Sequence, residues 1–269
     1  MVSFPNAKVN LGLQVLNKRE DGYHNIESCF LPISWCDILE VIESEELKIT
    51  FSGLSIPGQK EENLCLKAYH FISRQHSIPP VHIHLHKSSP MGAGIGGGSS
   101  DAAFTIRILN DLFSLGISNE NMQSYASMVG SDCPFFINNK TAIARGRGTD
   151  LKPIALDLSG KKIMVVNPDI HISTSEAYKN LNISEDQSDR IEEVIKTPIS
   201  NWKHLLHNDF EEYVFNRHPE IAALKDSFYK KGAIYASMTG SGASVYGIFE
   251  DKIPYFTFPE QFSSWTGDL

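Results

Sequence analysis

Hydrophobic and polar positions alternate strictly near the start of the chain. Apolar residues occupy every second position across residues 7–15, and polar or small residues fill the places between them, Lys8 and Asn10 among them. This period of two predicts a half-buried β-strand with Lys8 and Asn10 on its polar face. A polar loop that ends in Asp21-Gly22 predicts a hairpin turn into a second strand at about residues 23–33.

Later segments mix strand-like and helix-like periods. Short apolar runs predict strands at about residues 37–43, 47–51, 81–86, 133–137, 162–166 and 245–249. Spacings of three and four predict helices at 62–76, 119–128 and 219–230, and a further helix that opens at Ser99 with Ser or Asp as its N-cap. Residues 167–175 read as a loop and 184–190 as a polar stretch. We therefore expect an α+β fold in two lobes, with domains 1–152 and 153–269 that meet near Lys152-Pro153.

Composition narrows the class of protein. The 269 residues carry 24 Lys and Arg against 32 Asp and Glu, a formal net charge of -8, and the basic residues form only isolated doublets. A general nucleic-acid-binding surface would need a basic stripe, so that class is excluded. No apolar run approaches the roughly 18 residues that cross a membrane, and residues 1–6 lack the basic head and apolar core of a signal peptide. We expect a bacterial cytoplasmic protein whose four cysteines stay reduced.

Three histidines share one face of the strand predicted at residues 81–86. His82, His84 and His86 stand at positions i, i+2 and i+4, a spacing that places imidazoles together and can in principle hold a metal ion. The segment lacks a nearby carboxylate or cysteine partner. A polar or interface face is the favoured interpretation, and we assign no metal ligand.

A glycine-dense loop is the strongest candidate for chemistry. Five glycines fall within seven residues, at positions 92, 94, 96, 97 and 98, directly before the predicted helix. Glycines let the backbone approach a ligand closely, and a helix N-terminus presents unpaired N–H groups to an anion. The loop therefore predicts a phosphate-binding site. Its G-x-G-x-x-G pattern lacks the strand and acidic residue of a dinucleotide fold, and the chain has no Walker A sequence.

These segments resemble the GHMP small-molecule kinases. Residues 90–103 resemble the second motif of that family and residues 238–244 its third. Within the family, residues 5–11, 21–24 and 130–136 narrow the match to a branch that acts on a cytidine-diphosphate-linked alcohol. The resemblance implies a ribosomal protein S5 domain 2-like N-terminal lobe and a ferredoxin-like C-terminal lobe. It also implies ATP-dependent phosphorylation of the 2-hydroxyl of 4-diphosphocytidyl-2-C-methyl-D-erythritol in non-mevalonate isoprenoid synthesis, with ATP as co-substrate and Mg²⁺.

The resemblance also implies roles for individual residues. Asp132 is the expected catalytic carboxylate and Lys8 its cationic partner, since phosphoryl transfer needs an oriented nucleophile and charge neutralisation. The expected ATP-binding residues are Pro90, Gly92, Gly94, Gly96, Gly97, Gly98, Ser99 and Ser100. The expected substrate-binding residues are Asn10, Tyr23, His24, Thr174 and Tyr178. Gly240, Ser241 and Gly242 are expected to support the site.

Several points stay open at this level. Arg145 and Arg147 are candidates for a diphosphate contact or ordinary turn arginines. Ser99 is a candidate magnesium contact, but no dedicated acidic ligand can be named. Cys133, next to the catalytic carboxylate, is a possible site of oxidant sensitivity. Another GHMP kinase acting on a mevalonate-type alcohol or homoserine, a non-catalytic nucleotide-binding protein and a dehydrogenase are the alternatives. The oligomeric state is open between monomer and homodimer.

Overall fold

The computed structural model describes residues 1–181 and 190–269. These residues divide into two compact units that interleave along the chain. Unit 1 comprises Met1–Ala7, Ser34–Met91 and Gly96–Lys140, and unit 2 comprises Lys8–Ile33, Gly92–Ile95 and Thr141–Leu269. The continuous domains 1–152 and 153–269 stay a prediction. All of the polar stretch at 184–190 except Arg190 lies outside the described residues.

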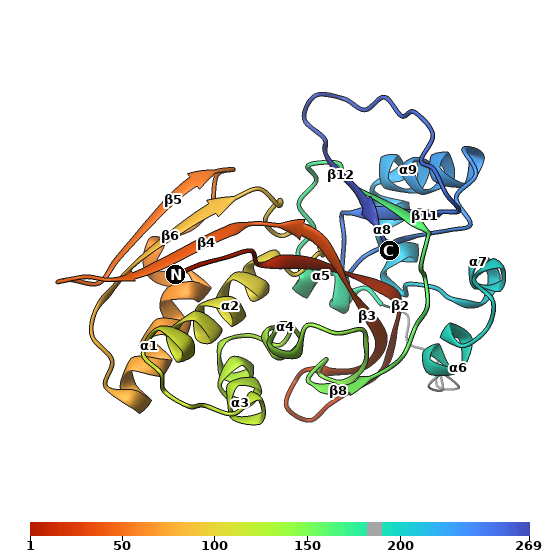
Figure 1. The fold of residues 1–269 in the computed structure, drawn as a ribbon. Helices are drawn as coiled ribbons and strands as arrows, with labels where there is room; N and C mark the ends of the chain where they lie inside the picture. The colour runs from red at the N-terminus through yellow and green to blue at the C-terminus, as the bar shows by residue number, and fades with distance from the viewer. Residues whose placement is uncertain (182–189) are drawn as a thin grey trace. The chain divides into compact units, whose positions relative to one another are not determined.

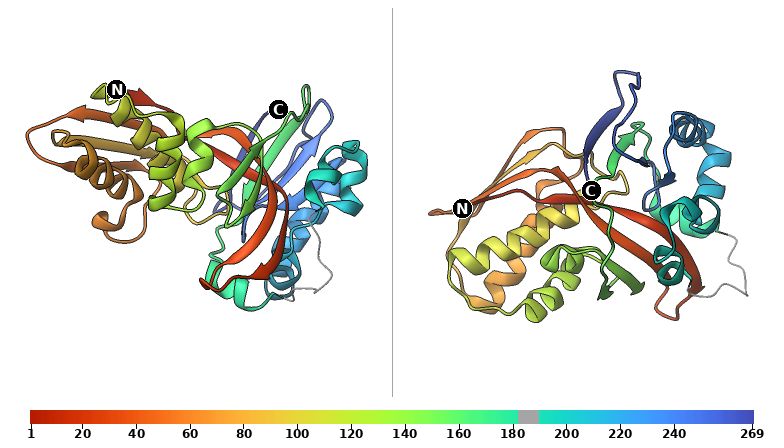
Figure 2. Two further views of the ribbon diagram at one scale, coloured as in Figure 1. Left: turned by 90° about the horizontal axis from the view of Figure 1, so that it is seen from below. Right: turned by 45° about the vertical axis from the view of Figure 1, so that its right-hand side comes forward.

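Unit 1 is a four-stranded sheet covered on one face by helices (Figures 1 and 2). The strand order is β1-β4-β6-β5, and only β5 runs parallel to its neighbour β6. The strands are β1 (Val2–Ser3), β4 (Ile38–Glu43), β5 (Lys48–Gly53) and β6 (Val81–Lys87). The helices are η1 (Lys60–Glu62), α1 (Leu64–His76), α2 (Gly97–Leu112), α3 (Asn119–Val129) and α4 (Cys133–Asn138). Apolar residues of β6 alternate inward, which places the histidines on its other face.

The three histidines belong to a hydrogen-bonded row on that face. Thr50 Oγ1 lies 2.8 Å from both His82 Nε2 and His84 Nδ1. Ser52 Oγ lies 2.9 Å from both His84 Nε2 and His86 Nδ1. Hydroxyl groups of β5 therefore occupy the space between the imidazoles. Across the described residues, no group of three or more His, Cys, Asp or Glu is placed to hold a metal ion.

Two sequence predictions fail in unit 1. The apolar run predicted as a strand at residues 133–137 is the helix α4, which Pro134 helps to start and which packs against α2 and α3. A short apolar run gives no period by which strand and helix can be told apart. The predicted cap of α2 is also wrong, because α2 begins at Gly97 and its N-cap is Gly96, with φ 72°. Glycine adopts this left-handed conformation without the strain that Ser or Asp would carry.

Unit 2 holds most of the predicted hairpin and a second sheet. The hairpin strands β2 (Asn6–Lys18) and β3 (His24–Cys36) form a sheet in the order β2-β3-β7-β8 with β7 (Ala142–Gly146) and β8 (Asp150–Pro153). The second sheet is antiparallel, in the order β10-β11-β9-β12. Its strands are β9 (Lys162–Asn167), β10 (Tyr235–Met238), β11 (Val245–Phe249) and β12 (Ser263–Asp268).

Helices complete unit 2. They are α5 (Thr174–Lys179), α6 (Ile191–Ile195), η2 (Ile199–Asn201), α7 (Trp202–Leu205), α8 (Phe210–Arg217) and α9 (Pro219–Lys230). The core of the unit joins α8 and α9 to the second sheet through Val214, Phe228 and Val245, all fully buried. Helix α5 begins inside the segment predicted as a loop. No helix in the described part of the chain is long and apolar enough to span a membrane.

Candidate active site

Strand β2 presents Lys8 and Asn10 to a buried polar cluster in unit 2. Lys8 Nζ donates to Asn10 Oδ1 at 2.6 Å and reaches the Gly94 carbonyl oxygen at 3.5 Å. The same Asn10 Oδ1 accepts from the Gly240 N–H at 3.0 Å and lies 3.1 Å from Thr239 Oγ1. Lys8 and Asn10 are 3% and 1% exposed. The predicted strand face is therefore confirmed as a shared face, and it is buried rather than half-exposed.

The amide of Asn10 is occupied by protein partners. Its Nδ2 donates to Ser28 Oγ at 2.8 Å, and its Oδ1 takes the donors just described. A buried amide whose groups are all paired holds its neighbours in place, because each lost bond would leave a desolvated polar atom. In this geometry Asn10 positions the Lys8 ammonium. Its direct contact with substrate stays a prediction.

Two glycines allow the backbone of the glycine loop to lie against the β10–β11 turn. Gly94 has φ 75°, and a Cβ there would lie 2.1 Å from the Thr239 carbonyl oxygen. Gly240 has φ 58°, and a Cβ there would lie 2.9 Å from Gly94 Cα. No side chain larger than hydrogen fits at either place without backbone movement. Gly94 and the supporting Gly240 are thus brought together within unit 2.

The first turn of α2, in unit 1, exposes unpaired backbone donors. The first helical hydrogen bond runs from the Ser100 N–H to the Gly96 carbonyl at 2.9 Å. The N–H groups of residues 97, 98 and 99 therefore have no intrahelical acceptor, and Gly96 offers no side-chain cap. The Ser100 side chain is fully buried, so Ser99 carries the more accessible hydroxyl of this turn. This is the geometry that binds anions.

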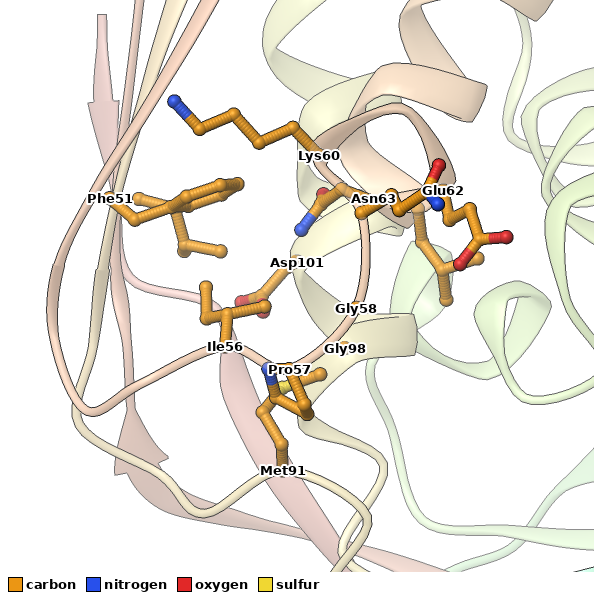
Figure 3. Close-up of a pocket in the computed structure, with 13 residues that line it drawn as sticks. Phe51, Ile56, Pro57, Gly58, Lys60, Glu62, Asn63, Met91, Gly98 and Asp101 are labelled. Carbon is orange, nitrogen blue, oxygen red and sulfur yellow. The ribbon is translucent and has the colours of Figure 1, made fainter.

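A pocket of about 340 Å³ adjoins this turn within unit 1 (Figure 3). Its walls are mostly apolar and come from β5, β6, the loop before α1 and the start of α2. The lining residues are Phe51, Ile56, Pro57, Gly58, Gln59, Lys60, Glu62, Asn63, Leu64, Leu85, Met91, Gly98 and Asp101. Figure 3 shows the Asn63 amide and the Asp101 carboxylate pointing into the pocket. Because Asn63 Oδ1 caps α1 through the Cys65 N–H, its Nδ2 is left as the donor toward the pocket.

Asp101 connects the pocket to a buried ionic cluster. Its Oδ2 accepts from Lys87 Nζ at 2.9 Å, and Lys87 also pairs with Asp37. Asp37 in turn accepts from the Ser88 N–H at 2.7 Å and from the Ser89 N–H at 2.8 Å. Burial raises the pKa of Asp101 to about 7 despite the Lys87 charge, since two carboxylates here share one ammonium. Asp101 Oδ1 is buried and has no hydrogen-bond partner among the described residues.

Asp132 stands immediately before α4 in unit 1. It occupies the N-cap position, with φ -86° and ψ -12°, but its carboxylate makes no capping bond to the helix. The neighbouring Cys133 is fully buried, and burial raises the pKa of its thiol to about 12. A buried, protonated thiol is a poor target for oxidants. The structure therefore argues against the expected oxidant sensitivity at Cys133.

The aromatic residues expected at the cytidine site lie together in unit 2. The His24 and Tyr178 rings stack with centroids 4.7 Å apart, which leaves no space for a third ring between them. The Tyr23 ring is 50% exposed and has the Arg147 guanidinium over its face, 3.6 Å from the ring centroid. Desolvation, and to a lesser extent the Lys18 charge, lowers the pKa of His24, so the imidazole is neutral at pH 7. Thr174 Oγ1 lies 3.0 Å from Ser241 Oγ.

Sequence reasoning missed the pocket in unit 1. Phe51 ends a predicted strand, Asn63 lies inside the helix predicted at 62–76, and Asp101 is a candidate cap of the next helix. In the structure Asn63 precedes α1 as its N-cap, and the Nδ2 of its amide faces the pocket. Thr239 lies inside a recognised motif but was not singled out. No sequence pattern marks these residues as a set, because their proximity depends on tertiary packing.

Comparison with known proteins places the chain in a family. The family models for the GHMP kinases N terminal domain and the GHMP kinases C terminal match residues 63–140 and 191–254. Proteins named 4-diphosphocytidyl-2-C-methyl-D-erythritol kinase from Cytophaga hutchinsonii and Bacteroides thetaiotaomicron are similar throughout. The first is 50% identical over 100% of this chain and 97% of that protein, and the second 46% identical over 97% and 95%.

Comparison with solved structures gives the same family. A crystal structure of 4-(cytidine 5'-diphospho)-2C-methyl-D-erythritol kinase covers 92% of this chain and 89% of its own at 31% identity, with a TM-score of 0.78. The mevalonate kinase of Methanococcus jannaschii is 15% identical over 93% of this chain and 90% of its own, with a TM-score of 0.67, and shares the fold alone. The chain belongs to the GHMP kinase family, within the group whose members are named 4-diphosphocytidyl-2-C-methyl-D-erythritol kinase.

Proposed function

We propose that this chain transfers the γ-phosphoryl group of ATP to the 2-hydroxyl of 4-diphosphocytidyl-2-C-methyl-D-erythritol. The products are the 2-phosphate and ADP, in the non-mevalonate route to isoprenoid precursors. The observation that carries the kinase chemistry is the first turn of α2, whose unpaired N–H groups adjoin an apolar pocket with two polar atoms. The identity of the alcohol that accepts the phosphoryl group is inferred from the names of the relatives.

The pocket in unit 1 suits the base of ATP. Its volume lies near the lower end of the roughly 300–1,000 Å³ typical of small-molecule sites, and its walls are apolar. Asn63 Nδ2 can donate to a ring nitrogen, and the Asp101 carboxylate stands at the wall of the pocket where the exocyclic amino group of adenine needs an acceptor. Because Gly98 belongs both to the pocket and to the first turn of α2, a base in the pocket places its phosphates near that turn.

Asp132 and Lys8 are proposed to act on the reacting groups. The 2-hydroxyl oxygen attacks the γ-phosphorus while the bond to the bridging oxygen of ADP breaks. Asp132 orients this hydroxyl and accepts its proton as the new P–O bond forms. The Lys8 ammonium, held by Asn10, stabilises the negative charge on the transferring phosphoryl oxygens.

Magnesium is part of this proposal. The described residues contain no cluster of acidic groups for a dedicated metal site. The donors present, Ser99 and the phosphates of ATP itself, are hard oxygens of the kind that Mg²⁺ prefers. When bound, Mg²⁺ would neutralise charge on the β- and γ-phosphates.

The cytidine end of the substrate is proposed to bind at Tyr23 and His24. A neutral imidazole can exchange hydrogen bonds with a pyrimidine edge, and the face of the Tyr23 ring opposite Arg147 offers a stacking surface. Since His24 and Tyr178 already stack, the base must bind beside this pair or separate it. Thr174, which lies on the same helix α5 as Tyr178 and bonds to Ser241, supplies a further hydroxyl.

An acceptor comparison tests the proposal. ADP release is measured with ATP and Mg²⁺ in the presence of the diphosphocytidyl substrate, mevalonate, homoserine or no acceptor. We expect stimulation by the diphosphocytidyl substrate alone. Stimulation by homoserine or mevalonate instead would keep the kinase chemistry and refute the substrate, and ATP binding without any acceptor-dependent release would refute the kinase.

A further inference from the structure

Arg145, in β7, and Arg147, in the turn that follows β7, have different environments. Arg145 is paired at 2.7 Å with the buried Glu27 and at 2.8 Å with Glu192, so its charge is used within the fold. Arg147 makes a contact of another kind, with its guanidinium carbon 3.6 Å from the centroid of the Tyr23 ring. Its Nε is buried and lacks a hydrogen-bond partner among the described residues.

The carboxylates around this turn already have partners. Asp21 accepts two bonds of 3.1 Å from Arg19 Nε and one of 3.1 Å from the Tyr23 N–H. Glu192 pairs with Lys152 and Lys196 as well as with Arg145. Arg147 is close enough to Asp21 for its charge to help lower the pKa of that carboxyl, but its direct contact is with the face of the Tyr23 ring.

Stacking occupies the flat face of the Arg147 guanidinium, and because its Nε is buried, the two Nη groups are the donors left for a ligand. A guanidinium over a ring uses its flat face for the contact, while its N–H groups point outward in its own plane. A 3.6 Å separation fits this arrangement. Tyr23 thus holds the side chain in one orientation without consuming its donors, which lowers the entropy cost of binding an anion.

We propose that Arg147 binds the diphosphate of the cytidine-diphosphate-linked substrate, which makes it a further substrate-binding residue. The inference rests on the proposed function. Arg147 offers only donors, which match phosphate oxygens, and its planar fork suits two of them at once. The diphosphate is attached to cytidine, whose expected readers Tyr23 and His24 stand beside Arg147. Arg145, two residues earlier, holds the turn through its carboxylate partners.

Binding of cytidine, CMP and CDP to the full-length protein separates a phosphate contact from a base contact. The variant Arg147→Met removes the charge and keeps an unbranched side chain, and Arg147→Lys restores a point charge. The matched control is Arg107→Met, because Arg107 also lies over an aromatic ring, 4.6 Å from the Phe104 centroid, and is outside the candidate site residues.

Calorimetry should show CDP affinity reduced about 10- to 100-fold in Arg147→Met, as expected for a charge-assisted hydrogen bond. Cytidine affinity should change less than twofold, Arg147→Lys should be intermediate, and Arg107→Met should match the wild type. Equal losses for cytidine and CDP would overturn the inference, because Arg147 would then act only through Tyr23. Unchanged CDP affinity would also overturn it.

Turnover of the diphosphocytidyl substrate by the wild type distinguishes failure of the role of Arg147 from failure of the proposed function. If the wild type is active while Arg147→Met binds CDP normally, only the role of Arg147 fails. If the wild type neither turns over the substrate nor binds CDP, the proposed function fails and the role of Arg147 falls with it.

Discussion

Lys87 Nζ donates to Asp101 Oδ2 at 2.9 Å beneath the first turn of α2, and both side chains are almost completely excluded from solvent. The same carboxylate points toward the pocket of unit 1. One residue therefore joins the ionic cluster that holds β6 and α2 together to the proposed base site. Its protonation should affect stability.

Asp101 is expected to make the protein less stable as pH rises. Its pKa is about 7 in the folded state and near 3.8 in the unfolded chain, so the folded state holds the proton more tightly between these values. Stability is lost as pH rises from about 4 through about 7. The melting temperature of Asp101→Asn, measured from pH 5 to 8, should decline less than that of the wild type. Parallel curves would show that Asp101 does not titrate in this range.

Asn63→Asp isolates the donor that faces the pocket. The new carboxylate keeps an oxygen to cap α1, but it replaces the amide donor by a negative charge beside Asp101. We expect the KM for ATP to rise about 5- to 20-fold, from loss of about 1–2 kcal/mol of hydrogen bonding. The KM for the alcohol and the melting temperature should stay near wild type. Initial rates with varied ATP measure this, and an unchanged KM for ATP would place the base elsewhere.

Gly94→Ala tests the close approach of the glycine loop to Thr239. Gly160 is the matched control, because its φ of 79° is close to that of Gly94 and a Cβ there would meet nothing within 4 Å. Gly160→Ala should cost about 1–2 kcal/mol of unfolding free energy from the left-handed backbone alone. Gly94→Ala should cost more and reduce activity, because its Cβ collides with a carbonyl oxygen. Urea unfolding compares them, and equal losses would deny the steric contact.

His24→Ala should weaken binding of the diphosphocytidyl substrate more than binding of ATP. The imidazole is neutral at pH 7 because desolvation lowers its pKa, so the proposed bond to the base is made by the neutral form. The KM for the diphosphocytidyl substrate should therefore rise in the variant, and in the wild type it should rise as the pH falls well below 6.5. Equal effects on the KM values for ATP and for the diphosphocytidyl substrate would show that His24 does not bind the cytidine.

Asp132→Asn should lose turnover and keep binding. Removing a catalytic base typically lowers kcat by about 10²- to 10⁴-fold, while an amide of the same shape preserves the local packing. Both KM values should stay within about threefold of wild type in steady-state assays. A rise in KM that accounts for the whole loss in kcat/KM would indicate a binding role.

The sequence predicted local structure best where one period ran over many residues. The alternation around Lys8 and Asn10 gave the right strand and the right shared face, and the glycine loop pointed to the start of α2. The predicted cap of α2 failed because the cap position needs a left-handed backbone, which Gly96 supplies, and the strand predicted at 133–137 failed because packing decided between local alternatives. Residues 133–137 are apolar in either conformation, and the core beside α2 and α3 selected a helix. The strand β12, Ser-Ser-Trp-Thr-Gly-Asp, has no run of apolar residues that would predict a strand, and its pairing with β9 stabilises it.

In the candidate site, too, some residues could be predicted from local sequence and others depend on tertiary packing. Its glycine and charged residues could be singled out from motifs, whereas the role of Asn10 could not, because its partner Thr239 is 229 residues away in the chain. Likewise, Asp101 looks like a helix cap in the sequence and is in fact the partner of Lys87. Contacts of this kind depend on the complete fold.

The central claim is that this chain phosphorylates the 2-hydroxyl of 4-diphosphocytidyl-2-C-methyl-D-erythritol. The most direct measurement is ³¹P NMR of the reaction with ATP and Mg²⁺, with wild type and Asp132→Asn in parallel. We predict a new phosphomonoester signal, coupled to formation of ADP and to retention of the diphosphate signals, in the wild type alone. A spectrum in which ATP is unchanged, or in which the new phosphate is on another atom, would contradict the account.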